Sequence, residues 1–326
     1  MPYPDASIRN RTATSRPWDT RVVGAGALSL TWFGCTTFRV EVAGRTLWFD
    51  TYMDRPPGVP PVGMSAAEVT AADLVFVSHA HFDHMLGADV IAQRTGATVV
   101  GSHEVAHVLL HNGVPEAQVL RVSGGEPVDC GDGIRVRVLP ALHSCLFGSG
   151  SSPDSAVECL GDLGVNAQDR AAATSAIFGL LRATDPERAA WFESTAHQCS
   201  THDGGQLAYL LETPEGSIFV SASAGHWSGI LRDLRPDVAI LALAGRPNVD
   251  GEPFQGSLAR FLVEQVEALR AETVVLCHHD ALLPPLLPPI DTGEALARLA
   301  RDVGHATHVE LTYGNPVDIL RRPRQG

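Results

Sequence analysis

The sequence predicts an α/β protein whose strands and helices pack as layers. Short apolar, β-branched runs bounded by Gly-rich turns recur along the chain, which is the pattern of buried strands. Segments with apolar residues at helical spacing follow several of these runs. Because strand and helix alternate in both halves of the chain, a layered sandwich is the expected architecture.

The first half is expected to open with three short strands and to continue with strand–helix pairs. Ser65 and Glu68 form a capping box, which indicates a short helix. Expected strands lie at 28–33, 36–42, 46–49, 73–77, 97–100, 119–122, 126–129 and 134–139, and expected helices at 83–94 and 102–111.

The second half repeats this order. Its buried strands are near-continuous apolar runs, and its helices each carry one apolar face. Expected strands lie at 206–211, 217–220, 237–243 and 273–276, with a final strand pair at 308–312 and 317–320, and expected helices lie at 227–234, 257–271 and 292–303.

The composition narrows the class of protein. A length of 326 residues suits one large α/β domain, and a formal net charge of −13 argues against nucleic acid as a partner. No apolar run reaches the ~20 residues of a membrane span, and the N-terminus lacks the apolar core of a signal peptide. We therefore expect a cytoplasmic protein. Its six cysteines form no Cys-x-x-Cys pair and indicate thiols of a reducing compartment: Cys35, Cys130, Cys145, Cys159, Cys199 and Cys277.

The most informative stretch is 78–84, Ser-His-Ala-His-Phe-Asp-His, directly after the expected strand at 73–77. Side chains two apart in extended backbone point the same way, so His79 and His81 can bind one ion. Asp83 and His84 follow a turn and can face a second ion. Imidazole and carboxylate groups are accepted zinc ligands, so this loop predicts a metal centre.

Other polar residues carry weaker signals. His103, His107 and His111 share one face of an expected helix, but no carboxylate or thiol accompanies them, and a surface role is the preferred interpretation. Asp50 ends the strand at 46–49, where it either orients a ligand or caps a turn.

The pattern His-x-His-x-Asp-His resembles the signature of the metallo-β-lactamase superfamily. The order of elements is most similar to the branch that contains L-ascorbate-6-phosphate lactonase and N-acyl-phosphatidylethanolamine phospholipase D. The resemblance covers about 28–320 and implies a four-layered αβ/βα sandwich. We expect an irregular N-terminal arm at 1–23 and one domain at 24–326, interrupted by an insertion at about 146–204.

The resemblance also implies a set of metal ligands. His79 and His81 would hold one ion with His143, which leaves a strand end. Asp83 and His84 would hold the other with a histidine at the end of the strand at 273–276. Strand alternation does not choose between the two histidines there, and the resemblance favours His278. His279 then becomes a neighbour of the site or a substrate contact, as do Asp280, His202 and Asp203.

One position departs from the family pattern. Family members usually carry an Asp that bridges both ions after a strand, and this chain has Ser223 there. A neutral hydroxyl is a poor bridging ligand. The second metal is then weak or absent, or a nearby group such as His226, Asp203 or Asp280 substitutes, or the site is degenerate. A retained metal site is the preferred interpretation, because the other ligand positions are filled.

The insertion at about 146–204 holds two expected helices, at 166–182 and 185–193. Because it starts just after the strand end that carries His143, we interpret it as a helical lid over the site. A dimer contact, and with it a homo-oligomer, is one alternative, and an ordinary helical hairpin is another.

These features predict a zinc-dependent hydrolase of a small-molecule ester, lactone or amide. One or two Zn²⁺ ions are expected, with Mn²⁺ or Fe²⁺ as alternatives. Zinc lowers the pKa of a bound water to about 7, and the resulting hydroxide attacks the substrate. Asp83 would orient that hydroxide or shuttle its proton. A phosphodiesterase of a small or lipid substrate, and a non-catalytic metal-binding or ligand-sensing protein, are the alternative functions.

Overall fold

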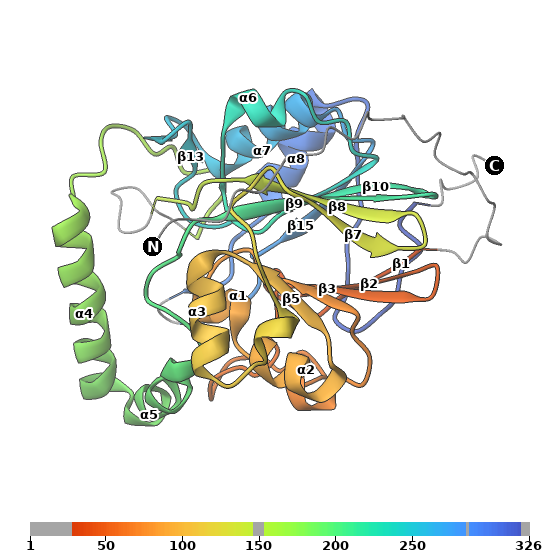
Figure 1. The fold of residues 1–326 in the computed structure, drawn as a ribbon. Coiled ribbons are helices and arrows are strands. Elements are labelled where there is room, and N and C mark those ends of the chain that lie inside the picture. Colours follow the sequence, from red (N-terminus) through yellow and green to blue (C-terminus); the bar gives the residue numbers. More distant parts are fainter. Residues whose placement is uncertain (1–27, 146–152, 285–286, 321–326) are drawn as a thin grey trace, which may run out of the picture.

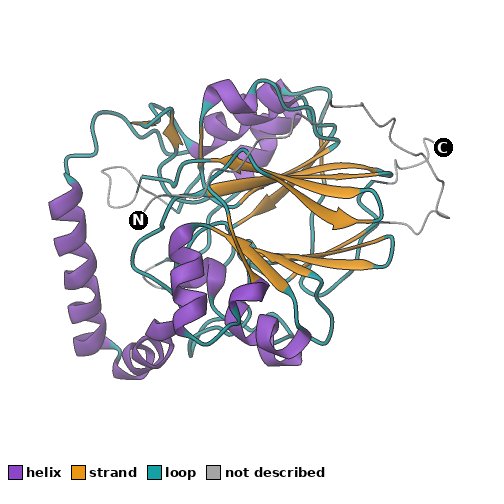
Figure 2. Ribbon diagram, viewed as in Figure 1, coloured by secondary structure: helices purple, strands orange, loops and turns teal. Residues whose placement is uncertain are grey.

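A computed structural model describes residues 28–145, 153–284 and 287–320. The expected arm at 1–23 lies outside these ranges, as does the part of the insertion at 146–152. Two β-sheets lie face to face, and helices cover the outer face of each (Figures 1 and 2). The prediction of a four-layered α/β sandwich is confirmed.

The first sheet, drawn in red to yellow in Figure 1, has six strands in sequence order. β1 to β3 pair antiparallel, and β3 to β6 pair parallel. The outer face carries α1 (Phe82–Met85), α2 (Ala88–Thr95) and α3 (His103–His111). The strands are β1 (Ser29–Trp32), β2 (Phe38–Val42), β3 (Arg45–Phe49), β4 (Leu74–Phe76), β5 (Thr98–Gly101) and β6 (Val119–Arg121).

The second sheet has seven strands in the order β16-β15-β12-β10-β9-β8-β7. Its outer face carries α6 (Ser228–Leu231), α7 (Leu258–Leu269) and α8 (Gly293–Asp302). A small separate sheet joins β11 (Gly225–His226), β13 (Asn248–Val249) and β14 (Glu252–Pro253). The main strands are β7 (Pro127–Gly131), β8 (Ile134–Pro140), β9 (Leu207–Thr213), β10 (Gly216–Ser221), β12 (Val238–Ala242), β15 (Thr273–Cys277) and β16 (Thr307–His308).

Three apolar clusters hold the four layers together. Between the sheets, the rings of Phe49 and Phe76 lie 5.2 Å apart and both meet Tyr209 of the opposite sheet. Phe261 of α7 packs on the outer face of the second sheet, and Ile91 of α2 on that of the first. Strands such as β12 are buried on both faces, which explains their continuous apolar sequence.

The layering brings the carboxyl ends of strands from both sheets to one edge. β1, β3 and β4 run in one direction in the first sheet, as do β8, β10 and β15 in the second. Ligands in α/β proteins commonly bind at such an edge. The loops that leave these strands carry the candidate site residues.

The insertion contains α4 (Ala167–Thr184) and α5 (Pro186–Thr195), close to the two helices expected there. Figure 1 shows α4 standing apart from the layers. α5 is anchored to the body by Arg188, which donates to the carbonyls of Pro57 and Pro284. Phe192 of α5 contacts Phe82 edge to face, with ring centroids 5.0 Å apart. Phe82 belongs to the 78–84 loop, so the insertion touches the metal-binding stretch.

Three expectations about elements are wrong. The helix expected at 83–94 is two helices, because Gly87 adopts φ +92 and a Cβ there would lie 2.6 Å from that of Ala66. The helix expected at 227–234 is the single turn α6. The final strand pair does not form, since β16 joins β15 whereas Val317 bridges to Leu30 in the other sheet.

Candidate metal centre

His79, His81 and His143 form the first group of potential metal ligands, and their ligand atoms lie within 4.8 Å of one another. The Nε2 of His79 lies 3.1 Å from the Nδ1 of His81. The Nδ1 of His79 lies 3.1 Å from the Ser78 hydroxyl, and the Nδ1 of His143 lies 2.8 Å from the carbonyl of Ser144. Hydrogen bonds on the far nitrogen fix the tautomer and leave the other nitrogen for a metal.

Asp83, His84 and His278 form a second group together with Cys35, again with ligand atoms within 4.8 Å of one another. An Asp83 oxygen lies 3.2 Å from the Nε2 of His84 and 3.3 Å from the Nε2 of His278. Cys35 is fully buried. No metal-binding role was predicted for it from the sequence, although it follows the carboxyl end of β1 as Asp50 follows that of β3.

Asp50 orients the second group from behind. One of its oxygens lies 2.8 Å from the Nδ1 of His84 and accepts hydrogen bonds from the hydroxyls of Thr36 and Ser78. The other accepts from the backbone N–H of Ser78 at 2.7 Å. This arrangement places the proton of His84 on Nδ1 and directs Nε2 toward Asp83.

The two groups adjoin. The rings of His79 and His84 lie 3.8 Å apart, and that of His278 lies 5.3 Å from His84. Each group takes side chains from both sheets, since His143 and His278 come from the second sheet and the others from the first. The edge of the sandwich therefore brings together two adjacent groups of potential metal ligands.

Electrostatics differ between the two groups. Burial lowers the pKa of His79 and His81, and lowers that of His143 to about 3, so these imidazoles are neutral. Burial also lowers the pKa of His84, but the carboxylates of Asp83 and Asp50 outweigh it and raise the pKa to about 10. Burial raises the pKa of Asp83, and its histidine neighbours reverse this and hold it well below its usual range. The first group has the neutral donors a dication needs, and the second must release protons to bind one.

Several other predicted residues lie outside both groups. Ser223 accepts a hydrogen bond from the backbone N–H of Ser144 at 3.0 Å, so it braces the loop that carries His143. His226 contacts the amide of Gln265 at 3.2 Å and stacks on a ring of α7. His279 stacks on Trp32, with ring centroids 5.4 Å apart.

The remaining candidates lie on loops around the centre. Asp203 accepts a hydrogen bond from the backbone N–H of Gly205 within its own turn. Burial lowers the pKa of His81, and the charge of Asp203 opposes this effect without outweighing it. His202 is exposed at that turn. Asp280 is bound to the backbone of Cys35, with oxygens 3.0 and 3.1 Å from its nitrogen.

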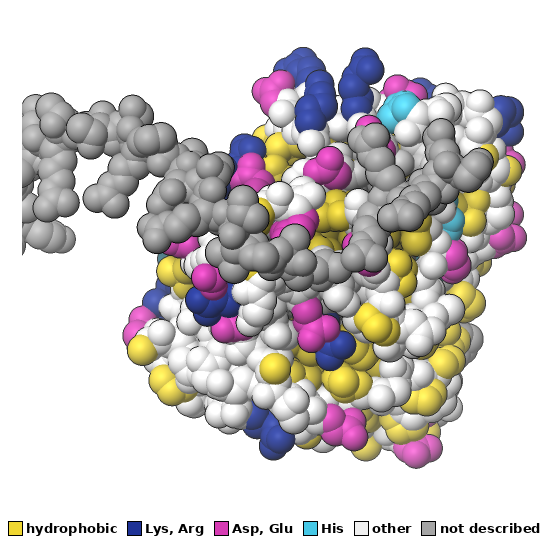
Figure 3. Space-filling view, turned by 90° about the vertical axis from the view of Figure 1, so that its right-hand side faces the viewer, with side chains coloured by type: hydrophobic (Ala, Val, Ile, Leu, Met, Phe, Trp, Pro, Cys, Tyr) yellow, Lys and Arg dark blue, Asp and Glu magenta, His cyan; other side chains and the backbone are white. Residues whose placement is uncertain are grey.

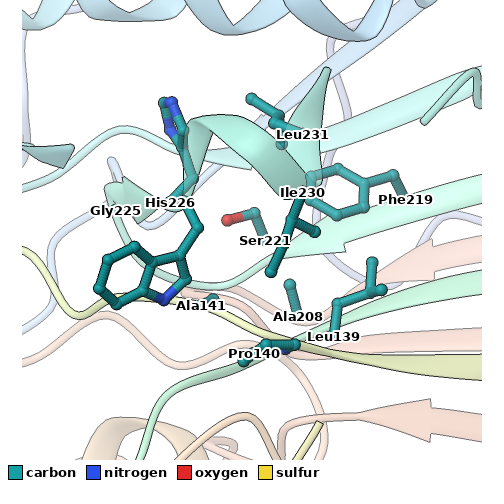
Figure 4. A pocket seen from close by; sticks show the side chains of 11 residues that line it. Leu139, Pro140, Ala141, Ala208, Phe219, Ser221, Gly225, His226, Ile230 and Leu231 are labelled. Atoms are coloured by element: carbon teal, nitrogen blue, oxygen red, sulfur yellow. The ribbon is translucent and has the colours of Figure 1, made fainter. Parts of the chain in front are cut away.

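A small cavity of about 10 Å³ lies beside α6, between the ends of β8 and β10 (Figure 4). Its lining is mostly apolar, including Leu139, Phe219 and Leu231, with Ser221 and His226 at its polar side. This volume holds about one water molecule. No residue of the two metal-binding groups lines it, so it is not the substrate site.

Charges on the surface are mixed. On the face that Figure 3 presents, acidic and basic side chains are interspersed with hydrophobic ones. Arg246, the basic residue of the loop at 245–253, is fully buried and donates to the carbonyls of Phe254 and Gly161. It therefore braces a loop instead of facing a substrate. Among the helices in the described ranges, none has the length and apolar character that a membrane span requires.

Comparison with known proteins agrees with this geometry. Residues 45–161 match the family model described as "Beta-lactamase superfamily domain", which includes the 78–84 loop and His143. This part of the chain is therefore similar to the metallo-β-lactamase superfamily. Membership of the lactonase-like branch stays a prediction.

Relatives of this chain are named metal-dependent hydrolases. A UPF0173 metal-dependent hydrolase of Pyrobaculum calidifontis is 34% identical over 141 residues, which are 41% of this chain and 61% of the relative. The match thus spans about three fifths of that relative's length. One from Myxococcus xanthus is 25% identical over 277 residues, 82% of this chain and 77% of that relative.

Solved structures share the fold of this chain. Igni18, described as a novel metallo hydrolase from Ignicoccus hospitalis, has a TM-score of 0.58 at 20% identity, covering 90% of this chain and 98% of its own. An isothiocyanate hydrolase from Delia radicum gut bacteria has a TM-score of 0.54 at 12% identity, covering 89% and 98%. At these identities the likeness concerns the fold alone.

Proposed function

We propose that this protein is a metallo-β-lactamase superfamily member and a zinc-dependent hydrolase of a small-molecule ester, lactone or amide. The observation that carries the proposal is the pair of adjoining donor groups at one edge of the sandwich. Three neutral imidazoles in the first group match the ligand set of a catalytic zinc with an open position. The relatives named metal-dependent hydrolases support the same class of activity.

His79, His81 and His143 would hold the first ion, and Asp83, His84 and His278 the second. Bound metal would supply a water of lowered pKa and polarise the scissile group. Asp83 lies where it can take up or return a proton, because the carboxylate reaches both His84 and His278. Asp50 keeps His84 in one tautomer, and His278 is favoured over His279 because His279 packs on Trp32.

The class of substrate is argued from charge and from the insertion. The net charge of −13 and the burial of Arg246 disfavour a phosphodiester, which needs a cation beside the metals. Phe192 of α5 contacts Phe82 of the metal loop, and Trp191 packs against the same apolar cluster as Phe82, so the insertion offers an apolar boundary beside the site. We propose that it acts as a lid for a partly hydrophobic small molecule. The six cysteines, none of which is in a disulfide, support a reducing compartment, the cytoplasm.

The test combines metal analysis with a panel of chromogenic esters, lactones, amides and phosphodiesters. We expect bound zinc and turnover of the carbonyl substrates, with both reduced in His81→Ala. His107→Ala is the matched control, because His107 is exposed on α3 and away from the centre. A folded protein that binds no metal, or activity that survives His81→Ala, would refute the proposal. Preferential turnover of phosphodiesters would favour the phosphodiesterase instead.

A further inference from the structure

We propose that the Cys35 thiolate is a ligand of the second metal, which makes that site a Cys-Asp-His-His site. The inference rests on the proposed function, since it concerns a ligand of the same centre. Its subject is a residue on the loop between β1 and β2, far in sequence from the 78–84 motif.

The position of the thiol is the first argument. The sulfur lies within 4.8 Å of the ligand atoms of Asp83, His84 and His278. Cys35 is fully buried, so its thiol faces this group and not solvent. A buried thiol among two imidazoles and a carboxylate has the donor set typical of a tetrahedral zinc site.

The backbone of Cys35 is fixed on both sides, which holds the thiol in its position. Its N–H donates to both oxygens of Asp280, at 3.0 and 3.1 Å. Its carbonyl accepts from the indole of Trp32 at 3.0 Å and from the N–H of His278 at 3.0 Å. The residue adopts φ +45, a conformation that non-glycine residues rarely adopt. Such a conformation persists only where the surroundings hold it, and it often marks a functional position.

Asp280 is itself held in place. Its carboxylate accepts from Arg55 at 2.7 Å and from the hydroxyl of Tyr313 at 2.6 Å. The Arg55–Asp280 pair is almost completely buried, with side chains 2% and 8% exposed. We assign Asp280 as a positioning residue that sets the Cys35 loop, and not as a ligand, because its oxygens already accept from the Cys35 N–H, Arg55 and Tyr313.

Charge is a further argument. Asp83 is the carboxylate of the second group, whereas Ser223 offers only a neutral hydroxyl, which accepts from the backbone N–H of Ser144. The ligands proposed from the sequence would therefore give two dications only one carboxylate, and the other ligands are neutral imidazoles. When the thiol loses its proton to solvent and binds the metal, it supplies a second negative charge. A thiolate also favours Zn²⁺ or Co²⁺ over the harder Mn²⁺.

Cobalt substitution tests the proposal without relying on activity. The metal-free protein is titrated with Co²⁺ and followed by absorption. We expect an intense near-ultraviolet band from sulfur-to-cobalt charge transfer as the second site fills. Cys35→Ser should lose this band while the weaker visible cobalt bands of the first site stay. Cys277→Ser and Cys199→Ser, which remove other thiols near the centre, should retain it.

The outcomes separate this inference from the proposed function. Protein that binds no cobalt at all refutes the metal centre itself. Wild-type protein that binds two cobalt ions without the near-ultraviolet band overturns the assignment of Cys35, whatever the variants do. A band that persists in folded Cys35→Ser or Cys35→Ala overturns it as well.

Asp280→Asn tests the positioning role. We expect the charge-transfer band to weaken or shift and the second cobalt to bind at least tenfold less tightly, with the first unchanged. Asp250→Asn is the control, because Asp250 holds Ser228 at the surface through a similar pair of hydrogen bonds. A band of unchanged position and intensity in Asp280→Asn would overturn the positioning role.

Discussion

Asp50→Asn is predicted to weaken the second metal site while sparing the first. One Asp50 oxygen accepts from Thr36, Ser78 and the Nδ1 of His84, at 2.7, 2.9 and 2.8 Å. The other accepts from the backbone of Ser78 and must stay an oxygen in the variant. The new amide group then faces three donors. For it to donate to His84, that ring must move its proton to Nε2, the atom that faces Asp83.

The magnitude follows from this loss of tautomer control. Substitution of groups that orient metal ligands typically costs 10- to 100-fold in affinity, or about 1.4 to 2.8 kcal/mol. Equilibrium dialysis of zinc with a competing chelator should therefore lower occupancy from two ions to one per chain at an intermediate chelator concentration. Asp237→Asn is the matched control, because Asp237 binds both the N–H and the hydroxyl of Ser217 far from the centre. Two ions retained with unchanged affinities would refute the reasoning.

Three further predictions concern acid stability, the insertion and metal loading. Burial lowers the pKa of His226 to about 4. Between pH 6.5 and 4 the unfolded chain therefore binds a proton at this residue that the folded protein does not bind. Wild-type protein should lose at most about 3 kcal/mol more stability over that range than His226→Gln, and parallel denaturant curves would contradict this. Phe192→Ala should weaken α5 docking by about 3 to 5 kcal/mol and speed proteolysis of the insertion, whereas Leu180→Ala, 55% exposed, should not. Equal cleavage rates would count against a docked α5. Zinc binding at pH 7 should release protons, because the pKa of His84 is about 10 without metal. Calorimetry in buffers of different ionisation enthalpy measures this proton release. A binding enthalpy that does not depend on the buffer would contradict it.

The fold was accessible from the sequence because its signals are local. Buried strands such as β12 are continuous apolar runs, and the 78–84 loop follows one of them. The expected helix at 83–94 fails at Gly87, where the backbone turns to pass close to Ala66. That constraint comes from a distant segment of chain and has no periodic signature.

The membership of the second group was only partly accessible. Asp83 and His84 stand in one motif, and the structure places them with His278. The sequence predicted Cys35 only as a thiol of a reducing compartment, because its role depends on how the β1–β2 loop crosses toward β15. A usable signal existed, since β1 runs parallel to β3 in direction and its carboxyl end must reach the same edge as Asp50. Ser223 marked the departure from the family pattern but did not indicate which residue compensates for it.

The division of the donors between the two sheets has a consequence for assembly. Within the described ranges, the named strands of the first sheet lie between residues 29 and 121 and those of the second between 127 and 308, although Tyr313 and Val317 form bridges to β1. His143 and His278 belong to the later segment, and the other donors to the earlier one. Neither segment alone carries a complete coordination set. Each bound ion would link the two segments of the chain through its ligands. The two segments, produced as separate fragments, should therefore bind each other more tightly when metal is present.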